Sequence, residues 1–309
     1  MPIVSIVLLV LTFAANFIID FIFWVIMFNI VQPFMSRSLF PVGHEMDVLL
    51  QLTVLSILVP ATVSLLGFMQ RFTVWTYGGR KAVGDDYTRL FNLLSDIYKR
   101  GQLGDPHYYH LYVCNDPTIN AFALGNRHIV IHRGAMNQLD DYQLLGVIAH
   151  EMGHLQNHHT MVRLCICGME WFGQVIRLVY RTLLFFCRLL AWIPIVNWFV
   201  VIFSWIIVIQ DRICGWFLQI PSTLINLFGF RQHEYQADAY AYKIGLGQNI
   251  IAFFHTLQRV YGNDKSGFFG SFWQDHPDLP NRIARIEKMM AADHKGAREN
   301  GYVRYGDNW

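Results

Sequence analysis

Residues 140–159 read DDYQLLGVIAHEMGHLQNHH, and the chemistry and fold of the chain can be worked out from this stretch. Its two leading aspartates suit the N-terminus of a helix, and the apolar residues after them predict that the helix continues past His154. In that helix His150 and His154 share one face, one turn apart, so both imidazoles can reach one zinc ion. Glu151 lies beside them, where its carboxylate can remove a proton from a water molecule. The pattern therefore predicts a zinc site with Glu151 as general base.

A catalytic zinc ion takes three protein ligands and keeps one position open, so the chain must supply a third ligand. The metzincin pattern requires a later histidine at a position where this chain has a threonine, which excludes that class. Glu234 is the expected third ligand, because helical polar sequence resumes around it and Asp238 follows on the same face. Asp238 is expected beside the ligands, accepting an N–H from a ligating histidine. Glu170 and His158 remain alternatives for the third ligand; His158 and His159 are otherwise expected on the helix surface or beside the ligands.

The bulk composition places part of the chain in lipid. Of the 309 residues, 54% are hydrophobic and 15% are charged, whereas a soluble domain has about 25% charged residues. So few charges cannot cover a water-soluble fold of this size. The basic residues are scattered and the net charge is only +2, so no nucleic-acid partner is expected. The five cysteines form no C-x-x-C pair and are expected to be reduced thiols.

Four transmembrane helices in two hairpins are expected. Segments 3–31 and 48–69 each contain the roughly 20 apolar residues that a crossing needs. The first carries Asp20, for which a structural role is expected rather than a functional one, because no basic partner is obvious. The second hairpin falls within 164–230, where scattered charges leave the two crossings open. They fit either 189–209 with 213–230 or 165–187 with 192–210.

These spans divide the chain into four segments. They are an N-terminal membrane hairpin (1–70), a first part of the catalytic domain with the HEMGH helix (71–163), a second membrane hairpin (164–230) and a second part of the catalytic domain with the third zinc ligand (231–309). In the second segment the residue pattern predicts a helix over 85–100 and strands over 110–114 and 128–132.

Two constraints predict on which side of the bilayer the catalytic segments lie. His154 and Glu234 must meet at one ion, so the chain between them crosses the bilayer an even number of times. The loop between the first two spans has one basic residue, Arg37, whereas several follow the second span. Because basic residues concentrate on the cytoplasmic side, residues 71–163 and the N-terminus are expected in the cytoplasm.

Several segments, in order along the chain, resemble one family. The chain is similar to the HtpX-type membrane metallopeptidases, within the wider family that includes the CAAX prenyl endopeptidases. The resemblance covers about residues 70–290, and the HEMGH and E-x-x-x-D patterns are its most specific parts. The matching segments are 120–123, 128–134, 150–154, 234–238 and 276–282.

This resemblance implies an α+β membrane protein, with a mainly helical gluzincin-type catalytic domain and a small sheet. One zinc ion per chain would be held by His150, His154 and Glu234. An edge strand before the zinc helix would pair with the substrate backbone; its residues would be His128, Ile129, Val130, Ile131 and His132. Three further residues would lie near the cleft, the last two as candidates to stabilise the oxyanion: Asn120, His276 and Arg282.

The resemblance also implies proteolytic quality control, with unfolded or membrane proteins as substrates. The chain would be a multi-pass protein of the bacterial inner (cytoplasmic) membrane, with its catalytic domain facing the cytoplasm. Two alternatives remain: a CAAX-type endopeptidase that acts on prenylated tails, and a membrane metal-binding protein without peptidase activity. The sequence gives neither the individual substrate nor the oligomeric state.

Overall fold

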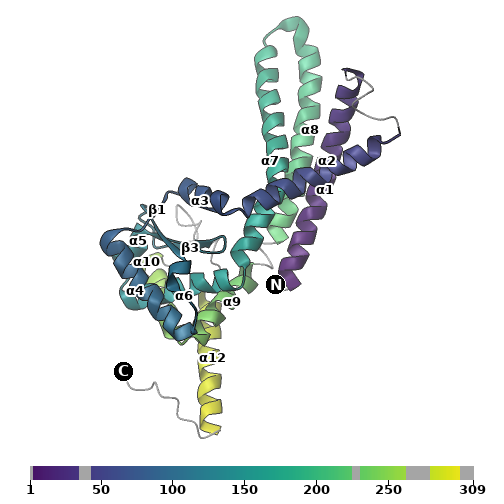
Figure 1. Ribbon diagram of the computed structural model, residues 1–309. Coiled ribbons are helices and arrows are strands. Elements are labelled where there is room, and N and C mark those ends of the chain that lie inside the picture. The colour runs from purple at the N-terminus through teal and green to yellow at the C-terminus, as the bar shows by residue number, and fades with distance from the viewer. Residues whose placement is uncertain (1–2, 35–42, 225–229, 262–278, 300–309) are drawn as a thin grey trace. The chain divides into compact units, whose positions relative to one another are not determined.

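The computed structural model describes residues 3–34, 43–224, 230–261 and 279–299 (Figure 1). The chain forms two compact units. We call Met1–Gln70 with Met161–Gly229 the helical unit, and Arg71–Thr160 with Phe230–Trp309 the mixed unit. Each unit joins segments that lie far apart in the sequence. The two apolar hairpins therefore share one unit, and the two polar segments share the other.

Long apolar helices build the helical unit. They are α1 (Ile3–Val31), α2 (Glu45–Ser64), α7 (His159–Leu190) after its first turn, and α8 (Pro194–Leu224); the short helix η1 (Gln32–Phe34) follows α1. Among the described residues, three helices are long and apolar enough to cross a membrane, over Val4–Val31, Glu45–Ser64 and Asn197–Gln219. Charged residues interrupt α7, which pairs with α8 as the other arm of a hairpin (Figure 1). The expected fold class, an α+β membrane protein with about four spans, is confirmed.

The turn of the second hairpin falls at residues 191–193. Crossings at 189–209 and 213–230 are therefore wrong, because α8 continues through Asp211 and Arg212 without a break. The pair 165–187 and 192–210 is closer, although its second crossing stops before the end of α8. The charges end the apolar run but not the helix, since Asp211 pairs with an arginine on α7.

Two kinds of contact hold the helical unit together. At Gly168 of α7 an added Cβ would lie 2.6 Å from the Ala61 Cα atom of α2, so only glycine allows this close approach. Asp20 of α1 is buried, and its carboxylate accepts a hydrogen bond of 2.8 Å from Ser56 Oγ of α2. That bond links α1 to α2 in a region away from water. In such a region a polar group without a hydrogen-bond partner would be costly.

The mixed unit combines six α-helices and a four-stranded sheet among its described residues, and α3 (Gly67–Thr76) leads into it. The helices are α4 (Gly84–Gly101), α5 (Arg133–Gln138), α6 (Asp141–Gln156), α9 (Phe230–Lys243), α10 (Gly247–Tyr261) and α12 (Leu279–Glu299), with the short helix η2 (Pro106–Tyr108). The strands are β1 (Gly79–Lys81), β2 (His110–Cys114), β3 (Ala121–Leu124) and β4 (His128–His132). The predicted helix over 85–100 and the strands over 110–114 and 128–132 are confirmed as α4, β2 and β4.

The strands follow the order β1-β2-β4-β3, and this order corrects one prediction. β4 pairs in parallel with β2 and antiparallel with β3, so its backbone is bonded on both sides. The prediction that residues 128–132 form an edge strand is therefore wrong. The reason can be read from the residues: Ile129, Val130 and Ile131 are a continuous apolar run, all fully buried, which is typical of an interior strand. Among the described residues, β3 is the outermost strand next to it.

The core of the mixed unit fills the space between the sheet and α4, α6 and α10. Leu90, Leu94 and Ile97 of α4 are fully buried at helical spacing. Leu144 and Ile148 of α6 are fully buried in the same cluster. This packing fixes α6 on the sheet, with the histidine-bearing end of the helix turned toward α9.

Candidate metal centre

The start of α6 is fixed by its own sequence. The Asp140 side chain accepts a hydrogen bond of 2.8 Å from the Gln143 N–H, and the Gln143 side chain accepts one of 3.3 Å from the Asp140 N–H. This capping box satisfies the first backbone donors of the helix. The start of α6 is thereby set by local residues. This start in turn fixes the positions of His150 and His154 in the last two turns of the helix.

Two glycines of α6 let neighbouring helices come close. An added Cβ at Gly153 would lie 2.7 Å from the Ala237 Cα atom of α9, and one at Gly146 would lie 2.6 Å from the Asn249 carbonyl carbon of α10. Neither position has room for a larger residue unless the backbone shifts. Gly153 lies between His150 and His154 in the sequence, and Ala237 lies between Glu234 and Asp238. The close approach of α6 and α9 at Gly153 therefore brings Glu234 within reach of both imidazoles.

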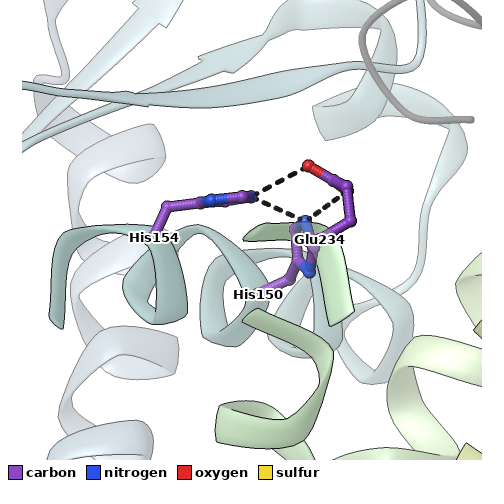
Figure 2. A group of neighbouring side chains, drawn as sticks. All are labelled: His150, His154 and Glu234. Atoms are coloured by element: carbon purple, nitrogen blue, oxygen red, sulfur yellow. Dashed lines mark hydrogen bonds and ion pairs between the residues drawn. The ribbon is translucent and has the colours of Figure 1, made fainter. Parts of the chain in front are cut away.

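Three side chains converge on one point, as Figure 2 shows. His150 Nε2 lies 3.3 Å from Glu234 Oε2, and His154 Nε2 lies 3.2 Å from Glu234 Oε1. The two imidazole Nε2 atoms are 3.2 Å apart. Their ligand atoms all lie within 4.8 Å of one another. Two nitrogens and a carboxylate oxygen from two helices are a donor set of the kind that catalytic zinc sites use.

The electrostatics of this point favour a cation. All three side chains are buried or nearly so, so electron-rich atoms at these separations repel one another unless a proton or a metal ion lies between them. Burial alone would lower the pKa of His150, yet the Glu234 and Asp238 carboxylates raise that pKa to about 9. The residues therefore fit a bound metal ion, which would take the place of that proton.

Asp238 orients the first histidine. Its Oδ1 atom lies 2.9 Å from His150 Nδ1, which makes Nδ1 the protonated nitrogen and leaves Nε2 free to bind a metal. Arg282 donates to both Asp238 oxygens, from Nε and from one terminal nitrogen, each at 2.7 Å. Burial would raise the pKa of the Asp238 carboxyl, but Arg282 and His150 hold it below its ordinary value. Asp238 thus stays ionised as a hydrogen-bond acceptor.

A different chain of contacts orients the second histidine. His159 Nε2 lies 2.8 Å from the Gln236 amide oxygen, which can only accept, so Nε2 carries the proton and Nδ1 of the neutral ring is an acceptor. His154 Nδ1 lies 3.1 Å from that His159 Nδ1 and donates to it. His154 Nε2 is then the unprotonated nitrogen, on the side of Glu234. The His159 ring also stacks on His233, with ring centroids 4.0 Å apart.

Replacing His159 with Ala should weaken zinc binding by about 10–100-fold, the usual cost of losing a partner behind a metal ligand. The reason is that His154 loses the acceptor that fixes its tautomer and ring orientation. Zinc affinity would be measured by competition with a chelator of known affinity. His158→Asn is the matched control, because asparagine tolerates the left-handed backbone that His158 adopts at φ 60°. An equal loss of zinc affinity in both variants would mean that the backbone of residues 158–159, and not the His159 ring, supports zinc binding.

Arg282 has two neighbours of opposite charge. One terminal nitrogen lies 2.6 Å from Glu234 Oε2, and the rest of the guanidinium holds Asp238. Its side chain is 1% exposed and lies 4.4 Å above the centre of the Phe254 ring. Arg282 therefore fixes both α9 carboxylates relative to the histidines. The sequence had suggested its place near the cleft and a role at the oxyanion, but not its contacts with these two carboxylates.

A pocket opens beside the cluster. Its lining residues are Asn120, Val147, His150, Glu151, Phe254 and Arg282, with Ala121 and Phe253. The structure thus brings Asn120, Glu151 and Arg282 to the same pocket as His150 of the cluster. His276 lies outside the described residues.

The β4 histidines lie elsewhere. His132 Nδ1 is 2.8 Å from Thr118 Oγ1, and the His128 ring packs against His110 and Tyr112. Neither joins the converging metal cluster. β3, which the sequence did not single out as the free edge, contributes Ala121 to the pocket and packs against α6. The continuous apolar run 129–131 was the signal that could have pointed to β3 instead.

The comparison with protein families decides the identity. The model described as "Peptidase family M48" matches residues 87–290. The chain belongs to peptidase family M48. The resemblance to HtpX-like members is confirmed, and this M48 peptidase is a membrane metalloendopeptidase.

Its relatives bear the same kind of name. The M48 peptidase is 28% identical over 244 residues to "Protease HtpX homolog" of Tropheryma whipplei (strain Twist), covering 72% of this chain and 79% of that protein. It is 28% identical over 188 residues to "CAAX prenyl protease 1 homolog" of Dictyostelium discoideum, covering 57% of this chain and 41% of that protein. The crystal structure of S. mikatae Ste24p aligns with a TM-score of 0.44 and 19% identity, over 85% of this chain and 63% of that one.

Proposed function

We propose that this M48 peptidase holds one zinc ion per chain through His150, His154 and Glu234, and hydrolyses peptide bonds at the pocket beside them. The observation that carries the proposal is the convergence of three donor atoms from α6 and α9 within 4.8 Å. Glu151 lines the adjoining pocket, as a base that acts on a bound water must. Zinc is the cofactor that this donor set suits best.

Each residue around the proposed zinc site has its own role in hydrolysis. A zinc ion bound there would supply Lewis acidity and lower the pKa of a water molecule to about 7. Glu151 takes the proton that this water loses and passes it to the leaving amine. Asp238 and His159 keep the ligating histidines in the required tautomers. Arg282 contributes positive charge to the pocket wall, where the substrate carbonyl oxygen becomes negative.

The edge of β3 that has no strand partner in the described part of the chain is the proposed docking site for the substrate backbone. His132 donates to the Asn120 carbonyl oxygen, so alternate β3 residues bond to β4. Ala121 and Ala123 alternate with the residues that bond to β4. Their backbone N–H and C=O groups therefore point away from β4, toward the open side. The Asn120 side chain already accepts from the Ala121 N–H at 2.8 Å. This leaves the Ala121 carbonyl and both backbone groups of Ala123 as the pairing points.

Replacing Ala123 with Pro should lower kcat/KM by roughly 3–10-fold, because one backbone donor to the substrate is lost. An edge strand tolerates proline on its open side, so the sheet should remain folded. Ala123→Ser, which keeps the N–H, is the control and should retain near-normal activity. The measurement is steady-state cleavage of a fluorogenic peptide, with circular dichroism to check the fold. Normal kcat/KM in a folded Ala123→Pro enzyme would rule out pairing at this position.

Quality control of membrane proteins is the proposed biological role. Supporting it, the HtpX homologue matches over 79% of its length, whereas the CAAX protease homologue matches over 41%. CAAX-type enzymes are also expected to carry more spans than this chain. The inner membrane is the proposed location, by resemblance to HtpX-type enzymes, and the distribution of basic residues favours a mixed unit that faces the cytoplasm. Protease added to sealed inside-out vesicles should cleave that unit; protection there would reverse the proposed orientation.

The reconstituted enzyme should cleave an unfolded membrane protein at least about tenfold faster than a farnesylated CAAX peptide, a preference worth about 1.4 kcal/mol in the transition state. Both substrates would be presented in the same vesicles, and initial rates would be compared at equal concentration below saturation. Faster cleavage of the farnesylated peptide would support the CAAX-type alternative. If neither substrate is cleaved by the zinc-loaded protein, the non-proteolytic alternative stands.

A further inference from the structure

A charged pocket lies between α7 and α8 of the helical unit. Its lining residues are Arg177, Arg181, Asp211, Arg212, Trp216 and Gln219, with Ile213 and Gly215. Arg177 and Arg181 are one turn apart on α7, and Asp211 and Arg212 are adjacent on α8. Nothing in the proposed peptidase mechanism uses these residues, because they belong to the other unit.

The pocket carries excess positive charge. Asp211 Oδ1 lies 3.2 Å from Arg177 Nε and 3.7 Å from Arg181 Nε, so one carboxylate serves two guanidinium groups. Asp211 is the one acidic residue in the lining. For Arg212 no ion pair is found among the residues that the structure describes. Three arginines against one aspartate leave two positive charges without a counterion in the pocket lining.

The pocket is formed partly by buried groups. The side chains of Arg177 and Asp211 are 18% and 16% exposed, whereas that of Arg181 is 61% exposed. At Gly215 an added Cβ would lie 3.0 Å from a terminal nitrogen of Arg177, so the absence of a side chain there makes room for the guanidinium. The Arg177–Asp211 pair thus forms the inner wall, and Arg181 and Arg212 lie at the open side.

Exposed tryptophans indicate where the pocket lies along the hairpin. Trp171 of α7 is exposed and lies six residues, about 9 Å along the helix axis, from Arg177. Trp216, on the antiparallel helix α8, is also exposed, and Leu218, two residues after it, contacts Gly173, two residues after Trp171. Tryptophans concentrate at the membrane interface. Arg212 is one turn from Trp216, so its long side chain can reach that interface.

We propose that this pocket binds the phosphate group of an anionic phospholipid at the interface marked by Trp171 and Trp216. Guanidinium groups bind phosphate oxygens with paired hydrogen bonds, and two uncompensated arginines match one negative headgroup. Apolar residues around the pocket, such as Ile213 and Trp216, are exposed and suit the lipid's glycerol and acyl chains. Basic pockets between transmembrane helices are a recurrent form of headgroup recognition.

The test is the thermal unfolding of purified full-length protein in a neutral maltoside detergent. Three additives would be titrated separately: phosphatidylglycerol, phosphatidylcholine and inorganic phosphate. Phosphatidylglycerol should raise the unfolding temperature in a saturable way, and the other two should not. An equal rise with inorganic phosphate would show a free-anion site and overturn the lipid assignment. An equal rise with phosphatidylcholine would show general lipid solvation and overturn it as well.

Matched arginine variants locate the effect. Arg212→Gln should weaken the apparent affinity for phosphatidylglycerol about tenfold, as expected for the loss of one charge-assisted contact. Arg188→Gln removes one exposed charge from α7 outside the pocket and should leave that affinity unchanged. Arg181→Gln is the second pocket variant and also leaves the Arg177–Asp211 pair intact. Equal weakening by Arg188→Gln, or none by either folded pocket variant, would overturn the proposal.

Discussion

Replacing Glu151 with Gln should abolish peptide hydrolysis and leave zinc bound. The amide keeps the size of the side chain in the pocket wall but cannot accept the proton from water. Loss of a positioned general base costs about 10²–10⁴-fold in rate. The three metal donors are untouched, so zinc content should remain that of the wild type. Cleavage of an unfolded protein substrate and metal content, measured on the same sample, test both parts.

Glu287→Gln is the matched control for that variant. Glu287 is exposed on α12 and does not line the pocket, so the same chemical change there should leave the rate unaltered. Near-normal hydrolysis by the Glu151 variant would remove the residue from the mechanism. Loss of zinc in that variant would instead mean that Glu151 takes part in holding the ion.

Replacing Arg282 with Met should lower the stability of the metal-free protein strongly. The guanidinium lies 2.6 Å from a Glu234 oxygen and 2.7 Å from both Asp238 oxygens, and its side chain is 1% exposed. Removing it leaves two buried carboxylates without their shared counterion. Breaking a buried ion pair from one side costs about 3–5 kcal/mol. In a domain of this size that corresponds to a fall in unfolding temperature of roughly 6–20 °C.

Arg285→Met, on the same helix, separates this effect from a loss of charge or of helix propensity. Arg285 is exposed and lies 4.7 Å above the Tyr235 ring, so its loss should change the unfolding temperature little. Differential scanning fluorimetry of chelator-treated protein gives both values. If the two variants unfold at the same temperature, Arg282 does not stabilise the carboxylates as described.

Local sequence was sufficient to predict the helices that carry His150, His154 and Glu234. α6 has its own N-terminal cap, an apolar face and two histidines at helical spacing, so its start, direction and chemistry are all contained in one segment. The Glu234 and Asp238 pair was recognisable because two acids one turn apart share a helix face. Both segments reach the same site because Gly153 lets α9 approach α6, a contact that the sequence does not reveal by itself.

The failed predictions concern long-range pairing. Which strand is the free edge depends on how β2, β3 and β4 pair, and a segment's own residues specify that only weakly. The ends of the second hairpin were misjudged in one alternative because Asp211 and Arg212 break the apolar run while continuing α8. In both places contacts with another element outweighed the local pattern.

The sequence offered His159 a place on the helix surface or beside the ligands, but did not single out its contact with His154. His158 adopts a left-handed backbone at φ 60°, between the end of α6 and the start of α7, and this brings the His159 ring back to His154. Glycine usually marks such a position, and none is present here. Gln236 gave no signal of its own, since a glutamine two residues after an acid is common on any polar helix.

The most direct test of the metal site is the zinc content of purified protein after dialysis against a weak chelator. Wild type and Glu151→Gln should each retain about one zinc ion per chain. His150→Ala and Glu234→Ala should retain at most about one tenth of the wild-type zinc content, because a metal ligand is missing. Elemental analysis by mass spectrometry, with protein concentration from amino-acid analysis, gives the ratio. Full zinc in the Glu234→Ala protein would contradict the assignment of the third ligand and return it to Glu170 or His158.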